Sequence, residues 1–214
     1  MDMVKRFTFN HFGVNTYIIF DQDTKECAVV DPAAKESFED AQLTQYFDEH
    51  QFTPTMILLT HAHIDHIAGL KQICQTYNLP VTMHPDGLKL IKQAQAYASM
   101  LGFDIQSLDE LAVQPIQDND TLTVGNIAIE CRYVPGHCPG SMCYVLHDEQ
   151  IVLTGDALFC GSIGRTDLPG GDYPLLIEKI KTRLLTLPDN YLVLPGHGET
   201  TNIYDEKHHN GFLV

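Results

Sequence analysis

The 214-residue sequence contains no tryptophan, no CxxC pair and few basic residues. Its 13 Lys and Arg stand against 28 Asp and Glu, a formal net charge of −15, and its longest basic cluster is Lys5-Arg6. Nucleic-acid binding needs clustered basic side chains that neutralise phosphates, so we expect no nucleic-acid partner. The apolar run of roughly 18 residues that crosses a bilayer is also missing, so we expect no membrane partner.

The six cysteines are scattered, and the segment from Met1 to Phe20 lacks the sustained apolar region of a secretory signal. We therefore expect reduced thiols and a cytoplasmic location. With 44% hydrophobic residues the chain can bury a substantial core, and no Pro/Ser-rich linker divides it. The prediction is a single domain spanning residues 1–214, with the choice between monomer and homodimer left open.

Strand-like patterns come first in a run and are then mixed with helical patterns, twice over. Predicted strands cover residues 7–9, 16–20, 27–30, 56–59, 80–84, 121–134 with a break at 125–126, 141–147, 150–154 and 191–194. Predicted helices cover 37–50, 86–101 and 173–187, and another is expected to open at Asp65. This order is typical of mixed sheets covered by helices, an α+β arrangement.

The densest chemistry lies in His61-Ala62-His63-Ile64-Asp65-His66, directly after a short apolar strand. Four potential metal ligands in six positions is a density that packing alone does not require. His61 and His63 would point to the same side of an extended segment, because side chains alternate with period two. Asp65 and His66 would occupy the first turn of a helix. The spacing favours two adjacent cations over one tetrahedral ion.

In three later fragments, a predicted strand is again followed by a potential ligand beside Gly or Pro. They end in Gly136-His137, Gly155-Asp156 and Gly196-His197. The combined set of five histidines and two aspartates suits zinc, iron or manganese better than it suits a structural thiolate site. We expect two divalent metal ions, with zinc preferred to iron or manganese. Asp156, which belongs to no cluster, is our choice for a bridging carboxylate.

These motifs, from His61-x-His63-x-Asp65-His66 to Pro195-Gly196-His197-Gly198, resemble the metallo-β-lactamase superfamily over nearly the whole chain. The resemblance implies a four-layer αββα sandwich, with two mixed β-sheets flanked by helices and the site at one edge of both sheets. It also implies a distribution of ligands, with His61, His63 and His137 on one metal, Asp65, His66 and His197 on the other, and Asp156 between them.

Within that superfamily, the segment from Thr154 to Phe159, followed by Gly164-Arg165-Thr166-Asp167, is similar to the glyoxalase II and persulfide dioxygenase branch. The compact length and the ending Asn210-Gly211-Phe212-Leu213 look most like short bacterial glyoxalase II-like proteins. The resemblance implies a metal-dependent hydrolase of small glutathione-derived thioesters, above all S-lactoylglutathione, which would yield lactate and glutathione. The alternative is a persulfide dioxygenase with one iron. A lactonase and a non-enzymatic metal-binding scaffold rank lower.

The expected mechanism is attack of a metal-bound hydroxide on the thioester carbonyl, with one metal polarising the carbonyl oxygen. Asp65 would be the catalytic residue, because it can orient the hydroxide as well as bind metal. A thiolate is already a good leaving group, so the reaction requires no separate general acid.

Substrate recognition is less well specified. Arg165 matches a basic position near glutathione in glyoxalase II enzymes, but an aromatic found two residues later is Asp167 here. Arg165 is therefore either a substrate contact or an ion-pair partner of Asp167 or Asp172. Those enzymes also carry a C-terminal helical domain. Only 17 residues (198–214) follow His197, so we expect no such domain and looser glutathione binding.

Cys138, next to the predicted ligand His137, has two interpretations. It is either an oxidation-sensitive thiol beside the metal or a buried, inert one. The first interpretation predicts that peroxide inactivates the protein and spares a Cys138→Ser variant.

Overall fold

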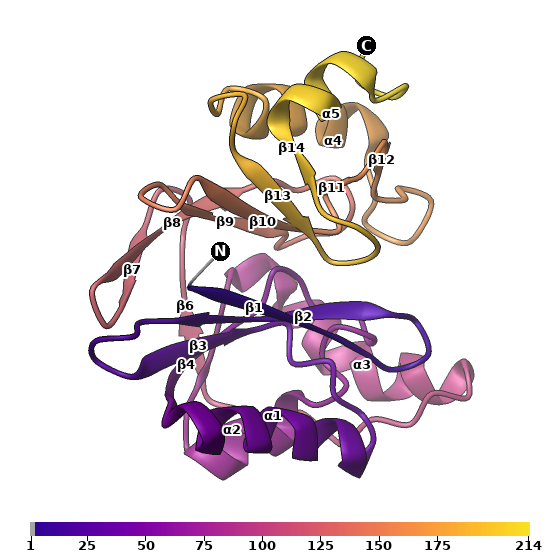
Figure 1. Cartoon of the computed structure of the whole chain (residues 1–214). Coiled ribbons are helices and arrows are strands. Elements are labelled where there is room, and N and C mark those ends of the chain that lie inside the picture. Colours follow the sequence, from indigo (N-terminus) through magenta and orange to yellow (C-terminus); the bar gives the residue numbers. More distant parts are fainter. Residues whose placement is uncertain (1–2) are drawn as a thin grey trace.

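The computed structural model describes residues 3–214, and its dominant feature is a pair of six-stranded sheets packed face to face (Figure 1). The first sheet contains, in spatial order, β1 (Val4–Phe9), β2 (Val14–Phe20), β3 (Glu26–Val30), β4 (Thr53–Leu58), β5 (Val81–Met83) and β6 (Val113–Pro115). Strands β1 to β3 are antiparallel, and β3 to β6 are parallel. Parallel neighbours need crossover connections, which here contain α1 (Ser37–His50), α2 (Leu70–Tyr77) and α3 (Leu88–Met100).

The second sheet is also mixed. It contains, in spatial order, β14 (Thr201–Asn202), β13 (Leu192–Pro195), β10 (Ile151–Gly155), β9 (Met142–Leu146), β8 (Ile127–Tyr133) and β7 (Thr121–Val124). Only β10 and β13 pair in parallel, and their crossover contains α4 (Tyr173–Lys179) followed by a π-helical turn, Ile180–Leu184. A small hairpin of β11 (Leu158–Phe159) and β12 (Ser162–Ile163) and the helix α5 (Ile203–His209) complete this half.

Three apolar cores separate four layers. In β2 every residue is buried, because both faces of the first sheet are covered. Ile18 faces a core shared with α1, α2 and α3, whereas its neighbours Tyr17 and Ile19 face the core between the sheets. This opposite placement follows from the two-residue period of a strand. A third core lies between the second sheet and the C-terminal helices, and includes Leu176 and Ile203. The predicted four-layer αββα sandwich, an α+β fold, is confirmed.

Most predicted elements end within three residues of the observed ones, but several short elements carried no sequence signal. β11, β12 and β14 have two residues each and β6 has three, too few for a period to show. The predicted helix over 173–187 changes to a π-helical turn at Ile180. α5 was missed because its seven residues are largely polar. Its Glu206 is nonetheless buried, and accepts hydrogen bonds from Gly161, Thr201 and Asn210.

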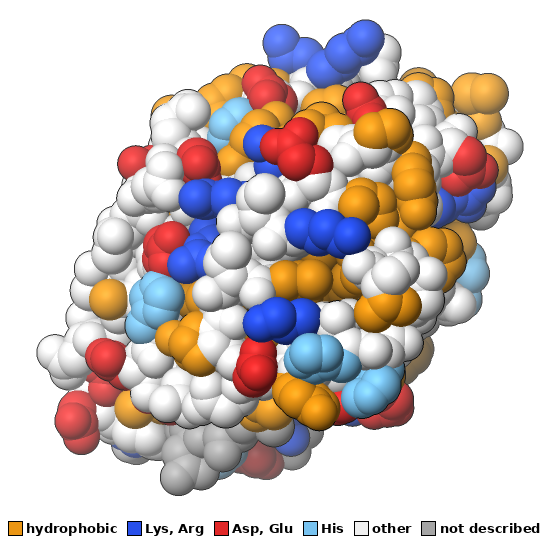
Figure 2. Space-filling view, turned by 90° about the horizontal axis from the view of Figure 1, so that it is seen from above, with side chains coloured by type: hydrophobic (Ala, Val, Ile, Leu, Met, Phe, Trp, Pro, Cys, Tyr) orange, Lys and Arg blue, Asp and Glu red, His pale blue; other side chains and the backbone are white. Residues whose placement is uncertain are grey.

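The basic side chains on one face of the molecule are interspersed with other kinds. Figure 2 shows the face over the C-terminal helices, where Lys and Arg side chains are scattered among acidic and apolar ones. On this face, no continuous basic track for phosphates is visible. Within residues 3–214, every helix is too short or too polar to cross a bilayer.

Candidate metal centre

The His61–His66 motif lies in the loop between β4 and α2, and this position corrects one expectation. Asp65 and His66 do not occupy the first turn of a helix, since α2 begins only at Leu70. They lie in a turn closed by the bond from the His66 amide to the His63 carbonyl, 3.1 Å long. Gly69, just before α2, packs so closely on the carbonyls of residues 32 and 34 that a Cβ would collide with them. The helix starts after this contact.

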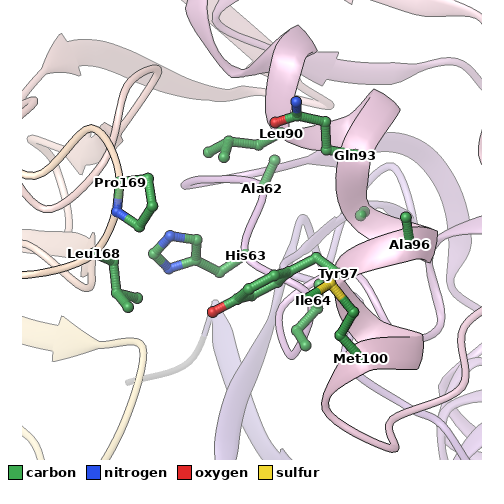
Figure 3. A pocket seen from close by; sticks show the side chains of 11 residues that line it. Ala62, His63, Ile64, Leu90, Gln93, Ala96, Tyr97, Met100, Leu168 and Pro169 are labelled. Carbon is green, nitrogen blue, oxygen red and sulfur yellow. The ribbon is translucent and has the colours of Figure 1, made fainter.

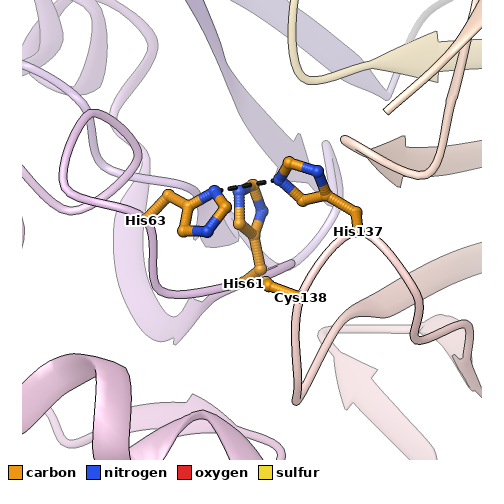
Figure 4. Close-up of side chains that lie close together, drawn as sticks. All are labelled: His61, His63, His137 and Cys138. Atoms are coloured by element: carbon orange, nitrogen blue, oxygen red, sulfur yellow. Dashed lines mark hydrogen bonds between the residues drawn. The ribbon is translucent and has the colours of Figure 1, made fainter. Parts of the chain in front are cut away.

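One ligand cluster consists of His61, His63 and His137, and the Cys138 thiol lies with them, all four ligand atoms being within 4.8 Å of one another (Figure 4). The ring centroids of His61 and His63 are 4.7 Å apart, and those of His63 and His137 are 4.5 Å apart. His63 Nδ1 and His137 Nε2 are separated by 2.9 Å. The first two histidines follow β4 in one sheet and the third follows β8 in the other, so the cluster joins the two sheets.

A second cluster consists of Asp65, His66 and His197, whose ligand atoms lie within 4.8 Å of one another. His197 Nε2 is 3.3 Å from both His66 Nε2 and Asp65 Oδ2. His197 comes directly after β13, beside Gly196. A Cβ at position 196 would collide with Asp156 Oδ1 and lie 2.7 Å from His66 Cε1, so the space around these ligands requires glycine.

Asp156 lies between the two clusters, at the end of β10. Its Oδ1 is 3.3 Å from His66 Nε2, whereas its Oδ2 is 3.7 Å from His137 Nε2 and 3.6 Å from His197 Nε2. One carboxylate therefore faces ligands of both clusters, as a bridging ligand must. The structure brings together all seven residues that the sequence singled out as metal ligands.

The remaining ring nitrogens explain why the ligand nitrogens face inward. His66 Nδ1 bonds Asp31 at 2.9 Å, His137 Nδ1 bonds the Arg165 carbonyl at 2.8 Å, and His197 Nδ1 bonds the Phe12 carbonyl at 3.1 Å. Each bond places the proton on Nδ1 and leaves Nε2 with a lone pair toward the site, the usual arrangement of metal-binding histidines.

Two buried polar atoms of the ligand set have no hydrogen-bond partner within residues 3–214, namely His61 Nε2 and Asp156 Oδ1. Buried polar atoms are nearly always satisfied, so orphaned atoms inside a ligand cluster indicate that a cation belongs there. With its imidazole nitrogens and carboxylate oxygens, the donor set fits divalent zinc, iron or manganese.

The electrostatics of the site also favour cations. Burial, reinforced by neighbouring histidines, lowers the pKa of His63 to about 4 and that of His61 well below its usual value, so both rings are neutral at pH 7. Burial also opposes protonation of His66, but the carboxylates of Asp156, Asp65 and Asp31 outweigh it and raise the pKa of His66. The negative potential that favours a proton on His66 favours a metal ion in its place.

Sequence reasoning missed Asp31, which supports the site from behind. Its Oδ1 accepts a 2.7 Å bond from the Thr60 amide, and its Oδ2 accepts bonds from the Thr60 hydroxyl and from His66 Nδ1. Asp31 is 2% exposed and directly follows β3. In the sequence Asp31-Pro32 indicated only the end of a strand. The available signal was the one used elsewhere, a polar residue at the end of a buried strand.

Arg165 and Cys138 each had two interpretations, and their contacts in the structure bear on both. The exposed Arg165 guanidinium makes two 2.7 Å bonds to Asp167, which is the ion-pair interpretation of this residue. Cys138 is fully buried and lies 3.3 Å from the Ser141 hydroxyl, and burial raises the pKa of its thiol to about 12. Because the thiolate is the reactive form, these features favour the inert interpretation of Cys138.

Comparison with known proteins places this centre in a family. The model of the metallo-beta-lactamase superfamily matches residues 10–197, a span that begins before the first cluster and ends on His197. The chain belongs to the metallo-beta-lactamase superfamily. The resemblance expected from the motifs is therefore confirmed.

Two relatives match along nearly their whole length. The probable metallo-hydrolase YqgX of Bacillus subtilis is 36% identical over 209 residues, covering 98% of this chain and 96% of the relative. The hydroxyacylglutathione hydrolase GloC of Haemophilus influenzae is 33% identical over 204 residues, covering 94% of this chain and 93% of the relative. Together with the family match, they identify the chain as a metallo-hydrolase.

Solved structures agree on the fold. The BLEG-1 B3 metallo-beta-lactamase superposes with a TM-score of 0.89 at 35% identity, covering 99% of this chain and all of that one. TTHA1623 in a di-iron-bound form gives a TM-score of 0.87 at 32% identity, covering 98% and 100%. ETHE1 from Myxococcus xanthus gives 0.79 at 28% identity, covering 98% and 83%. TTHA1623 shows that a similar chain of this fold can hold iron.

Proposed function

We propose that this metallo-hydrolase cleaves thioesters, with S-lactoylglutathione as the leading substrate and two zinc ions as its metals. The observation that carries the proposal is the Asp156 carboxylate, which faces ligand nitrogens of both clusters within 3.7 Å. The similarity to the hydroxyacylglutathione hydrolase GloC supports the substrate class. The cytoplasmic location and the choice between monomer and homodimer stay predictions.

The positions of the seven ligand residues assign them to two metal ions. His61, His63 and His137 would hold one ion, His66, His197 and Asp65 the other, and Asp156 would contact both. When bound, such ions polarise a carbonyl oxygen and lower the pKa of water toward about 7.

Asp65 positions the nucleophile in this scheme. Its side chain is 18% exposed at the edge of the site, so a water molecule can reach it. Burial tends to raise the pKa of the Asp65 carboxyl, but His66 and His197 outweigh burial and lower it. The group therefore stays ionised and accepts a hydrogen bond from the attacking water, which orients the water oxygen toward the carbonyl carbon.

Thioester cleavage then balances without a protein acid. The water oxygen forms a bond to the acyl carbon, and the carbon–sulfur bond breaks with its electron pair on sulfur. One water proton passes to solvent as the nucleophile forms, and the second is lost when the product carboxylic acid ionises. An ordinary thiol has a pKa of about 8.5, so the departing thiolate is stable enough to leave unprotonated. To contact a glutathione carboxylate, Arg165 has to exchange its two bonds to Asp167.

Steady-state hydrolysis of S-lactoylglutathione by zinc-loaded protein, followed as release of free thiol, tests the proposal. Asp156→Ala should lower kcat/KM at least about 100-fold, because one change disrupts both clusters. Asp148→Ala, in the turn at the opposite end of β10, is the matched control and should retain wild-type turnover. Thiol release that is equal in wild type and Asp156→Ala would sink the proposal.

The second candidate is a persulfide dioxygenase with one iron. The segment Gly164-Arg165-Thr166-Asp167 supports it, and TTHA1623 in its di-iron-bound form shows that a similar chain accepts iron, although two ions rather than one. Metal analysis and oxygen uptake with glutathione persulfide separate the candidates. One iron per chain with stoichiometric oxygen consumption would favour the dioxygenase and refute the thioesterase proposal. Bound zinc and no oxygen uptake would favour the thioesterase.

A further inference from the structure

A cavity of about 300 Å³ opens beside His63, between α3 and the loop that follows β12 (Figure 3). Its walls are mainly apolar. α3 contributes Leu90, Ala94, Tyr97 and Met100, and the loop contributes Leu168 and Pro169. The floor is the ligand loop itself, at residues 62–64, so anything bound in the cavity lies against the first ligand cluster.

The exposure of α3 indicates that this wall is built for a ligand. The helix is anchored by Ile91, Ala94 and Ala98, which are buried in the core next to the first sheet. Tyr97 and Met100 are instead 40% and 82% exposed. Large apolar side chains left uncovered next to a polar site are typical of ligand-binding pockets.

The cavity contains no charged partner for a ligand. Its polar side chains are His63, Gln93 and Tyr97, and within residues 3–214 no Lys, Arg, Asp or Glu lines it. Arg165, on the loop that forms the opposite wall, is already paired with Asp167. Burying a charged group without a partner is costly, so the carboxylates and ammonium group of glutathione do not suit this space. The occupant that suits it is uncharged and apolar.

We propose that this cavity binds an apolar acyl substituent of the thioester substrate and so selects longer acyl groups over acetyl. The inference rests on the proposed thioester hydrolysis and adds acyl specificity to it. The acyl side is favoured over the thiol side because an acyl chain continues from the carbonyl without charge, whereas the glutathione thiol carries charged groups. At the ~30 Å³ share of a water molecule, the volume holds roughly ten non-hydrogen atoms.

The first test is a chain-length series on one thiol carrier, from S-acetylglutathione to S-hexanoylglutathione. Each methylene moved from water into an apolar pocket should raise kcat/KM by about fourfold. Over the series we expect a rise of roughly 10- to 100-fold, since the open mouth of the cavity leaves part of the chain in water.

A pair of variants on adjacent α3 positions locates the effect. Ala96 lines the cavity and is exposed, so Ala96→Phe fills the space without disturbing the core, and it should bring the hexanoyl-to-acetyl ratio to within about threefold of one. Gln95→Phe adds the same ring at an exposed position outside the lining and should keep the wild-type ratio.

Binding of non-hydrolysable thioethers separates the pocket from the reaction. By titration calorimetry, S-hexylglutathione should bind wild type and Gln95→Phe at least about tenfold more tightly than S-methylglutathione does, and Ala96→Phe should abolish the difference. Length-dependent binding without any thioester turnover would support the pocket and refute the proposed hydrolysis. Equal affinity for both thioethers would overturn the pocket. The pocket would also be overturned if sedimentation showed that Ala96→Phe dissociates a dimer while the dependence on acyl chain length stays intact. In that case the apolar wall would be covered by a second copy of the chain and not by the acyl group.

Discussion

Asp31 offers the sharpest test of how the site is held in place. The perturbation is Asp31→Asn, which keeps the size of the side chain but replaces one acceptor oxygen with an NH2 donor. Asp31 has a φ of +51°, in the left-handed region, where Asn is tolerated far better than Ala. The substitution therefore changes hydrogen bonding without adding backbone strain.

The magnitude follows from the bonds that Asp31 accepts. The Thr60 amide, the Thr60 hydroxyl and His66 Nδ1 all donate to its carboxylate, and both residues are buried. The side-chain amide introduced by Asp31→Asn offers one acceptor oxygen in place of two, so at least one buried donor would face the new NH2 group. An unsatisfied buried donor costs about 1–3 kcal/mol, and for a chain of this size that shifts Tm by roughly 2–12 °C.

The larger effect is expected on metal affinity. His66 presents Nε2 to the second cluster because Asp31 holds its Nδ1 proton, and losing such a support typically lowers metal affinity 10- to 100-fold. Zinc competition against a calibrated chelator measures this change, and thermal unfolding of the metal-free protein measures the loss of stability. Asp148→Asn is the control. An Asp31→Asn affinity within twofold of wild type, or an equal loss in Asp148→Asn, would refute this role of Asp31.

Two further predictions concern the surroundings of the ligands. Gly196→Ala should lower zinc content and reduce kcat at least about tenfold, because the added Cβ would collide with Asp156 Oδ1. Metal analysis and steady-state kinetics measure both effects, and full zinc occupancy with wild-type turnover would contradict this. Peroxide at pH 7 should oxidise the exposed Cys160 before the buried Cys138, whose thiol pKa is raised to about 12 by burial. Peptide mass spectrometry over time would show the order, and earlier oxidation of Cys138 would contradict it.

The convergence of the ligands could be predicted from the sequence because each ligand has a recognisable local sequence pattern. His137, Asp156 and His197 each follow an apolar strand and sit beside glycine, and strands of layered sheets deliver such residues to a shared edge. The conformation of the ligand loop could not be predicted. Ile67 and Leu70 suggested a helix from Asp65. The Gly69 amide instead donates to the Pro32 carbonyl at 2.9 Å and the Asp65 carbonyl accepts from Asn10 Nδ2 at 3.0 Å, so the helical bond between residues 65 and 69 does not form, and only the folded chain brings these segments together.

The partners of Asp31 and the exposure of the apolar wall of α3 could not be predicted, for a related reason. Asp31 meets Thr60 because β3 and β4 pair in parallel, with Val30 opposite Leu58, and a single sequence does not show that register. Tyr97 and Met100 have the composition of a core-facing stripe, yet they remain exposed. Hydrophobicity alone does not distinguish a residue that packs against the protein from one that packs against a ligand.

The two clusters depend on both sheets, so their geometry depends on how the sheets are held together, and hydrogen bonds between the sheets lie next to the ligands. Tyr144 donates to the Leu59 carbonyl at 2.6 Å, and the Met142 amide donates to the Thr60 carbonyl at 2.7 Å, both just before His61. Tyr17 donates to the Pro195 carbonyl at 2.8 Å, two residues before His197. These bonds align the strand ends through the protein itself. The clusters are therefore preorganised, and the free energy of metal binding need not be spent on assembling them.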